Sequence, residues 1–172
     1  MPHDFETKRE LARAWEQRMG EWARRRGWYV LPTYDYSGRD DDKAPKLLAP
    51  PGRESLVLPD LQCVRPGETR WLEIKWKASC TRYVKGGYRT TGISLRLWEH
   101  YSQVELLTGG GVWVVFLHQE EQEIRGDSLA DLHRKVSHQY DGRKMGRGGM
   151  IFFRYDKLTR WGSLSMLAQE AA

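Results

Sequence analysis

Two carboxylates and a lysine lie close together in the sequence in a pattern that suits metal-dependent chemistry. Asp60 follows a leucine and a proline, and Glu73 and Lys75 follow it within the string LEIKW. Carboxylate oxygens are the ligands that Mg²⁺ prefers, and Mn²⁺ accepts the same ligands. A lysine beside such an ion can orient a water molecule or offset charge that develops in the transition state. The three side chains therefore predict hydrolysis of phosphodiester bonds, with Asp60 and Glu73 as metal ligands.

A hairpin is the element that would bring these side chains together. Residues 56–64 and 69–78 have the composition of strands, and the Arg-Pro-Gly-Glu between them fits a type II turn. Because side chains alternate along a strand, Glu73 and Lys75 share one face, and the apolar residues of LEIKW point the other way, into the core. We expect Asp60 on the partner strand to lie near Glu73 and Lys75, on a face turned away from the core.

The helix predicted ahead of the hairpin carries a third carboxylate. Residues 5 to 26 repeat apolar side chains at helical spacing, and Gly27 stands where a helix commonly ends. A helical projection places Glu16 beside small and apolar residues, namely Ala12, Met19, Gly20 and Ala23. A carboxylate on a packing face needs a partner or a chemical role. Two interpretations stay open: Glu16 is a further catalytic and metal-binding residue, or it only pairs with Arg13.

The remaining elements predict one α/β domain over residues 1–172, with a central mixed sheet flanked by helices. Residues 33–55 and 79–92 are rich in glycine and polar residues and are predicted as loops. We expect helices at 94–108 and 128–139, strands at 28–31, 112–117 and 150–155, and a short helical tail. The core would span residues 5–118, and residues 119–172 would form a C-terminal extension of helix and strand.

Composition limits the class of protein. Hydrophobic residues make up 40% of the chain, with eight tryptophans, which excludes a wholly disordered chain. No apolar run is long enough to span a membrane, the N-terminus has no apolar signal region, and two cysteines are too few for a disulfide framework. We therefore expect a cytoplasmic protein, in the host cell cytoplasm if the gene is viral.

The net charge of +5 comes from clustered basic residues. One cluster is the run of three arginines at 24–26, and the others fall within 75–96 and 143–147. A basic cluster either is a solvated face or contacts the phosphates of a nucleic acid. If the clusters flank a site for phosphate chemistry, the predicted nucleic-acid-binding residues are Lys77, Arg82, Lys85, Arg89, Arg143, Lys144 and Arg147.

Together these residues resemble the PD-(D/E)xK nuclease superfamily and, within it, the archaeal-type Holliday junction resolvases, over residues 10 to 118. Asp60, Glu73 and Lys75 match the PD…ExK pattern, Glu16 matches the glutamate of the first helix, and Ser37, in a Ser-Gly pair, matches a loop element. The resemblance implies a restriction-endonuclease-like core. It also implies a Mg²⁺-dependent homodimer that cuts four-way DNA junctions by paired incisions, in DNA recombination and repair. Ser37 would then assist catalysis, although a Ser-Gly pair is also ordinary turn chemistry.

The sequence departs from this family pattern in several places. The loop at 39–55 and the segment at 79–92 are longer than usual, Gln103 falls late in its helix, and residues from about 120 onward match nothing in the family. Two alternatives therefore stay open. The chain could be another nuclease of this superfamily that acts on duplexes, flaps or ends. It could also be a nucleic-acid-binding module that does not cut.

Overall fold

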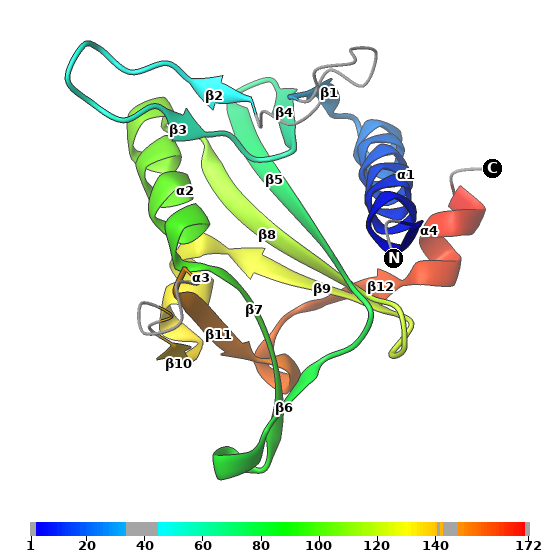
Figure 1. The fold of residues 1–172 in the computed structure, drawn as a ribbon. Coiled ribbons are helices and arrows are strands. Elements are labelled where there is room, and N and C mark those ends of the chain that lie inside the picture. Colours follow the sequence, from blue (N-terminus) through cyan, green and yellow to red (C-terminus); the bar gives the residue numbers. More distant parts are fainter. Residues whose placement is uncertain (1–2, 34–44, 141, 143–147, 171–172) are drawn as a thin grey trace.

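A six-stranded mixed sheet forms the centre of the molecule (Figure 1). The computed structural model describes residues 3–33, 45–140, 142 and 148–170. The strands of this sheet lie in the order β1-β4-β5-β8-β9-β12. Their bounds are Tyr29–Pro32 for β1, Leu61–Arg65 for β4, Glu68–Lys77 for β5, Gly111–His118 for β8, Glu123–Ser128 for β9 and Arg160–Ser163 for β12. Only β5 and β8 pair in parallel, so the sheet is mixed as predicted.

One face of this sheet is covered by α1 (His3–Arg25) and α4 (Leu164–Glu170), which lie together on the right of Figure 1. Their buried side chains pack on apolar residues of the sheet. We call this group the α1-side cluster: Met19, Ala23, Leu61, Cys63, Leu72, Ile74, Val115, Leu117, Ile124, Leu164 and Leu167. The helix predicted at 5–26 is confirmed, and Gly27 follows it at φ +82°, a conformation that favours glycine.

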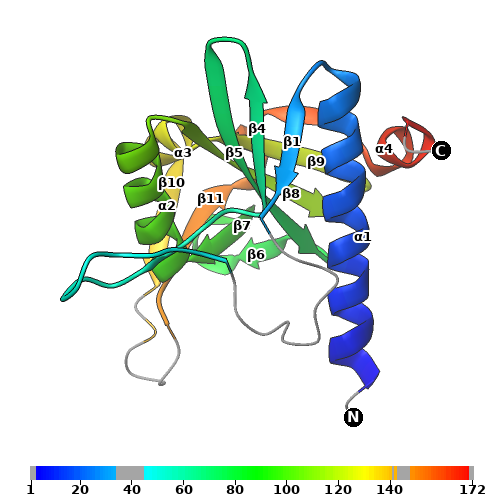
Figure 2. The ribbon, with the colours of Figure 1, turned by 90° about the horizontal axis from the view of Figure 1, so that it is seen from above.

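The other face is covered by α2 (Leu95–Thr108), α3 (Leu129–Arg134) and a second sheet (Figure 2). The second sheet has four strands in the order β10-β11-β7-β6, which span Val136–Tyr140, Met150–Arg154, Tyr88–Ser94 and Thr81–Tyr83. Buried residues here form the α2-side cluster: Trp71, Ile93, Tyr101, Val104, Val112, Val114, Phe116, Leu129, Leu132, Ile151, Phe153 and Leu158. The central sheet is therefore packed on both faces.

The second sheet corrects the sequence interpretation. Residues 79–92 are not a loop, because β6, the 3-10 turn Val84–Gly86 and most of β7 occupy them. The predicted helix at 128–139 ends at Arg134, and its remainder forms β10. Within the predicted loop at 33–55, Lys46–Leu47 forms β2, which pairs with β3 (Leu56–Val57). The C-terminal region contributes β12 and β11 to the two sheets, with Tyr155–Lys157 as a 3-10 turn between them.

The helix at 94–108 is confirmed. Ser94 caps α2, with its hydroxyl accepting a hydrogen bond from the Leu97 amide, and Gly109 ends the helix at φ +67°. In the described part of the chain, no helix is both long and apolar enough to cross a membrane.

Candidate active site

The predicted hairpin positions Asp60 at the entrance of β4. The hairpin pairs Arg65 with Glu68 across Pro66-Gly67, and Gly67 takes φ +75°. The first strand is shorter than predicted, because the chain leaves β3 at Val57 and re-enters a sheet only at Leu61. Asp60 therefore lies in the step before β4, where its Oδ2 accepts a 2.7 Å hydrogen bond from the Ile74 amide. This bond holds the carboxylate beside β5.

Glu73 and Lys75 share one face of β5, as predicted, and they form an ion pair. Their apolar neighbours Leu72 and Ile74 belong to the α1-side cluster on the opposite face. The expectation that this face turns away from the core is wrong, since Glu73 is only 1% exposed. Two packed clusters, one on each side of the sheet, explain the difference.

The carboxyl group of Asp60 is perturbed by burial and by its charged neighbours. Asp60 is 5% exposed, and its pKa lies well above the usual value, first because burial disfavours the charged form and then because of the negative charge of Glu73. The charge of Lys75 acts in the opposite direction, and the charge of Glu16 adds to that of Glu73. Two carboxylates side by side in a buried site favour either a proton or a cation between them.

Glu16 reaches the neighbourhood of this site from α1. The residues that follow it on the same helix face, Met19, Gly20 and Ala23, are buried, so the predicted packing face is confirmed. Glu16 itself lines a pocket of about 540 Å³ together with Gly20, Pro32 and Leu61, next in sequence to Asp60. The structure thus places the third carboxylate near enough to raise the pKa of Asp60. Its role in binding a metal stays a prediction.

The donor set fits a hydrated divalent cation better than a closed metal cage. Over residues 3–33, 45–140, 142 and 148–170, no three His, Cys, Asp or Glu side chains gather closely enough to hold a metal ion by themselves. However, Oε2 of Glu73 is buried and has no hydrogen-bond partner among the described residues. Mg²⁺ is commonly held by one or two carboxylates and keeps several waters. Asp60 and Glu73 meet that requirement.

Two residues that the sequence did not place at the site, Thr33 and His100, fix the segment that leads into Asp60. The Thr33 hydroxyl lies 2.6 Å from the Pro59 carbonyl and 2.9 Å from the Asp60 carbonyl, and the Thr33 amide donates to the latter. His100 on α2 is buried, and its Nδ1 accepts a 2.8 Å hydrogen bond from the Val57 amide. Neither contact has a sequence signal, because each joins segments far apart in the chain.

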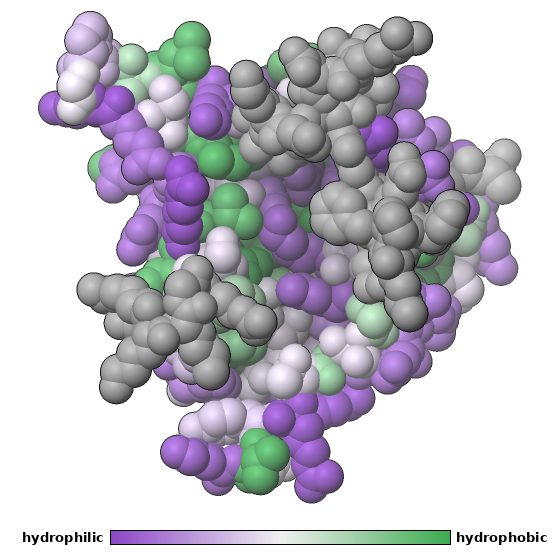
Figure 3. Space-filling view, in the orientation of Figure 1, coloured by the Kyte–Doolittle hydropathy of each residue, from purple (hydrophilic) through white to green (hydrophobic). Residues whose placement is uncertain are grey.

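The predicted DNA-contacting residues have different surroundings. Lys77 continues the face of Glu73 and Lys75 and is half-buried, and burial, followed by the charge of Lys75, lowers its pKa. Arg82 and Lys85 are exposed on β6 and the turn after it. In Figure 3, hydrophilic residues occupy much of the visible face, and apolar residues are scattered among them, both near the middle and at the edges. Ser37, Arg143, Lys144 and Arg147 lie outside the described residues.

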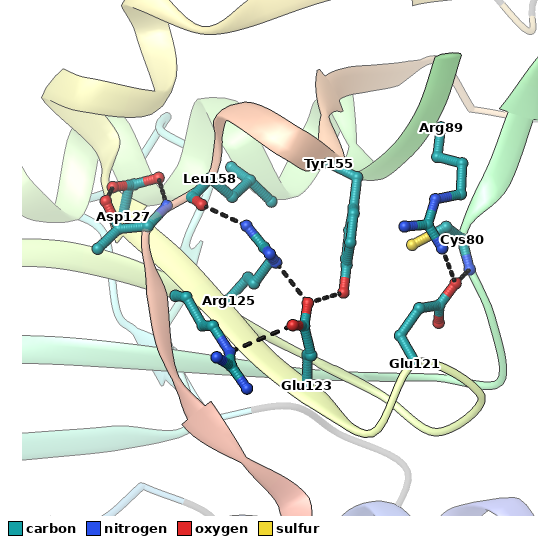
Figure 4. Close-up of polar contacts among 10 residues, drawn as sticks. Cys80, Arg89, Glu121, Glu123, Arg125, Asp127, Tyr155 and Leu158 are labelled. Atoms are coloured by element: carbon teal, nitrogen blue, oxygen red, sulfur yellow. Dashed lines mark hydrogen bonds and ion pairs between the residues drawn. The ribbon is translucent and has the colours of Figure 1, made fainter.

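Arg89 instead belongs to a network that joins the two sheets (Figure 4). It pairs with Glu121 at 3.3 Å and lies over the Tyr155 ring, 4.8 Å from its centroid. Glu123 accepts hydrogen bonds from Arg125 at 2.8 Å and from the Tyr155 hydroxyl at 2.5 Å, and these bonds lower its pKa. The network links β7, β9 and the segment after β11, so it connects the second sheet to the central sheet.

A buried histidine next to this network is neutral. His118 is fully buried against Phe116 and Tyr155, and neither ring nitrogen has a hydrogen-bond partner among the described residues. Burial lowers the pKa of His118 to about 4. It therefore carries no charge near neutral pH. The His118 and Tyr155 rings meet edge to face, as two apolar rings would.

Solved structures show which fold this is. Hjc from Archaeoglobus fulgidus, a Holliday junction resolvase from an archaeal hyperthermophile, is similar with a TM-score of 0.55 and 8% identity over 92% of this chain and 96% of that chain. A nuclease from a fusselovirus, D212, is similar with a TM-score of 0.40 and 14% identity over 84% of this chain and 74% of that chain. Neither a protein-family model nor a curated protein sequence matches the chain.

The likeness to Hjc confirms the predicted fold class, a nuclease fold with a central mixed sheet flanked by helices. This structural likeness extends over nearly all of both chains. It therefore reaches beyond residues 10 to 118, the range over which the sequence resembles the family. At this identity the likeness concerns the fold, and function must be argued from the site.

Proposed function

We propose that the protein is a Mg²⁺-dependent DNA endonuclease that acts on branched DNA, in particular on four-way junctions. The observation that carries this proposal is the buried pair of carboxylates, Asp60 just before β4 and Glu73 on β5, with the partly exposed Lys75 paired to Glu73, in the fold of Hjc. Burying two carboxylates is costly unless a cation or proton offsets their charge. A structural ion pair would need only one of them.

Each side chain has a distinct role in this proposal. Asp60 and Glu73 hold the cation, through the Asp60 carboxylate and the Glu73 oxygen that lacks a partner among the described residues. When bound, Mg²⁺ would polarise a phosphate oxygen and acidify a water molecule. Lys75, already held against Glu73, orients that water and offsets the charge that develops on the phosphate. Glu16 adds negative charge on the α1 side.

The preference for branched DNA is supported by the likeness to the fold of a Holliday junction resolvase. Paired incisions need two active sites, which a homodimer supplies. Edge strand β1 exposes apolar side chains that a second copy would cover, with Tyr29 78% and Leu31 60% exposed and Val64 beside them on β4. Large exposed apolar side chains on one strand face are typical of protein interfaces. Light scattering on Leu31→Lys tests this part, since the variant is expected to be monomeric.

Cleavage assays test the activity. The protein is incubated with Mg²⁺ and a synthetic four-way junction, and with flap, duplex and single-stranded DNA of matching sequence. We expect paired nicks near the branch point, with no product from Asp60→Ala. If duplexes, flaps or ends were cut faster than the junction, the proposed substrate would be wrong and the protein would be a nuclease for that other DNA. Binding without cleavage of any of these DNAs would make the chain a non-catalytic module, and cleavage by Asp60→Ala would refute the site.

A further inference from the structure

A pocket lined by tryptophan and arginine lies on the α1 side of the central sheet, on the opposite face from Glu73. Its volume is about 250 Å³. It opens between the end of α1, the β4–β5 hairpin and β12, and its floor is formed by Ala23, Cys63 and Leu72 of the α1-side cluster. Its walls are three tryptophans and three arginines: Trp22, Trp28, Trp161, Arg26, Arg65 and Arg70. We call it the Trp–Arg pocket.

The aromatic rings of this pocket are arranged face to face with each other and with guanidinium groups. Trp22 stacks on Trp161 with ring centroids 5.6 Å apart, and Arg26 covers Trp22 at 4.0 Å. Trp28 lies under Arg65 at 4.2 Å, and Arg70 is 5.1 Å from the same ring. Arg26 and Arg65 are exposed, and to uncover the indoles they would have to give up contacts, including the hydrogen bonds from Arg26 to the Trp22 carbonyl at 3.3 Å and from Arg65 to Glu68 at 2.7 Å. A flat ring could then take their place.

The charge of the pocket is positive. Arg65 and Arg70 share a single carboxylate, that of Glu68, so one positive charge of this pair is not neutralised by it. Arg26 adds a further charge at the rim, next to the exposed Arg24 and Arg25 at the end of α1. Of this run of three arginines, Arg26 lines the Trp–Arg pocket, whereas Arg24 lines the pocket of Glu16.

We infer that the Trp–Arg pocket binds an unpaired nucleotide of the DNA, with its base stacked on an indole and its phosphate held by the arginines. Indole faces bind bases of any sequence, and guanidinium groups bind phosphate oxygens through two parallel hydrogen bonds. The tryptophans also pack against the α1-side cluster, but an acidic peptide would pair with the arginines alone and would not use the indole faces. Bases within a duplex are already stacked on both sides, so the pocket selects a base that has left the helix.

This inference rests on DNA being the substrate in the proposed function, but it is tested by binding rather than by cleavage. The probe is a short fluorescent single-stranded oligodeoxynucleotide, and its anisotropy is measured without metal on Asp60→Asn protein. The matched probe has the same phosphates but abasic sugars. We expect at least about tenfold weaker binding of the abasic probe, because stacking of one base typically contributes this much. Equal binding of the two probes would refute the inference.

Variants locate the binding. Arg26→Ala is expected to weaken binding of the base-bearing probe several-fold, whereas Arg134→Ala, which removes another exposed arginine, at the end of α3, should leave it unchanged. Equal effects of the two substitutions would mean that only net charge matters, which contradicts the inference. Trp28→Leu tests the stacking surface directly, provided that its circular dichroism spectrum matches that of the parent.

The indole N–H signals of the folded parent protein give a measurement that needs no variant in the pocket. Addition of the base-bearing probe is expected to shift the signals of Trp22, Trp28 and Trp161 and to leave that of Trp98, on α2, in place. If hexaglutamate shifts the same signals and the oligonucleotide does not, the occupant is an acidic peptide and the inference is wrong. If the oligonucleotide binds here but no DNA is ever cut, the pocket stands and the proposed nuclease function fails.

Discussion

Replacement of Asp60 by asparagine is expected to stabilise the metal-free protein and to remove its activity. In the folded state the pKa of Asp60 is raised, first by burial and then by the charge of Glu73, above its ordinary value of 3.8. The folded state therefore binds this proton more tightly than the unfolded state does. As the pH rises from about 3.8 through the folded pKa, the unfolded chain loses the proton first, and stability falls.

The size of the effect follows from the contacts of the side chain. Asparagine retains an oxygen that can accept the 2.7 Å hydrogen bond from the Ile74 amide. Its amide group can in addition donate to the Glu73 oxygen that lacks a partner among the described residues. Each pKa unit corresponds to about 1.4 kcal/mol, and a hydrogen bond to a charged group contributes roughly 1.5–3 kcal/mol. We expect the free energy of unfolding of Asp60→Asn to exceed that of the parent by roughly 1–3 kcal/mol at pH 8. This difference corresponds to an increase of about 2–10 °C in Tm for a chain of this size.

Thermal unfolding followed by circular dichroism in EDTA measures this gain. The difference between Asp60→Asn and the parent protein should be larger at pH 8 than at pH 5, because the cost of ionised Asp60 is greatest at high pH. Asp156→Asn is the matched control, since Asp156 is exposed and its pKa is lowered by a hydrogen bond from Arg154, so this variant should gain nothing. A melting temperature of Asp60→Asn at or below that of the parent at pH 8 would refute the electrostatic reasoning.

Three further substitutions test other parts of the structure. Lys75→Gln should lower the rate of DNA cleavage by about 100-fold or more with Mg²⁺ affinity retained, measured by single-turnover cleavage and calorimetry; an unchanged rate would exclude the role of the lysine. His100→Leu leaves the β3 amide without its acceptor and should cost about 1–3 kcal/mol in urea unfolding, against no loss for the exposed Gln103→Leu. Gly92→Ala would push a Cβ into the Ile151 carbonyl oxygen and should cost about 1–3 kcal/mol, whereas Gly148→Ala, whose Cβ would have no atom of the described residues within 4 Å, should not.

Local signals in the sequence determined the elements around the site. The hairpin followed from its Pro-Gly turn and α1 from its apolar spacing, and Gly27 marked the end of α1 correctly. Strand alternation alone placed Glu73 and Lys75 on one face. These features depend on neighbouring residues, so a single sequence contains them.

Tertiary structure decided how that face is surrounded. From the hairpin alone, Glu73 was predicted on a face turned away from the core. The second sheet, built partly from residues predicted as loop and helix, covers this side of the molecule. β6 and β10 are short strands whose residues alternate weakly, and only their neighbours in the sheet select the strand conformation.

The sequence by itself predicted the residues of the proposed site: Asp60, Glu73 and Lys75, with Glu16 on the helix before them. Only the tertiary structure decided that the two carboxylates are buried together, which gives Asp60 its raised pKa. It also brought Thr33 and His100 to the segment that leads into Asp60, and tryptophans from α1 and β12 into one pocket. The physical reason is the same in each case, since burial and long-range contacts depend on segments that are distant in the chain.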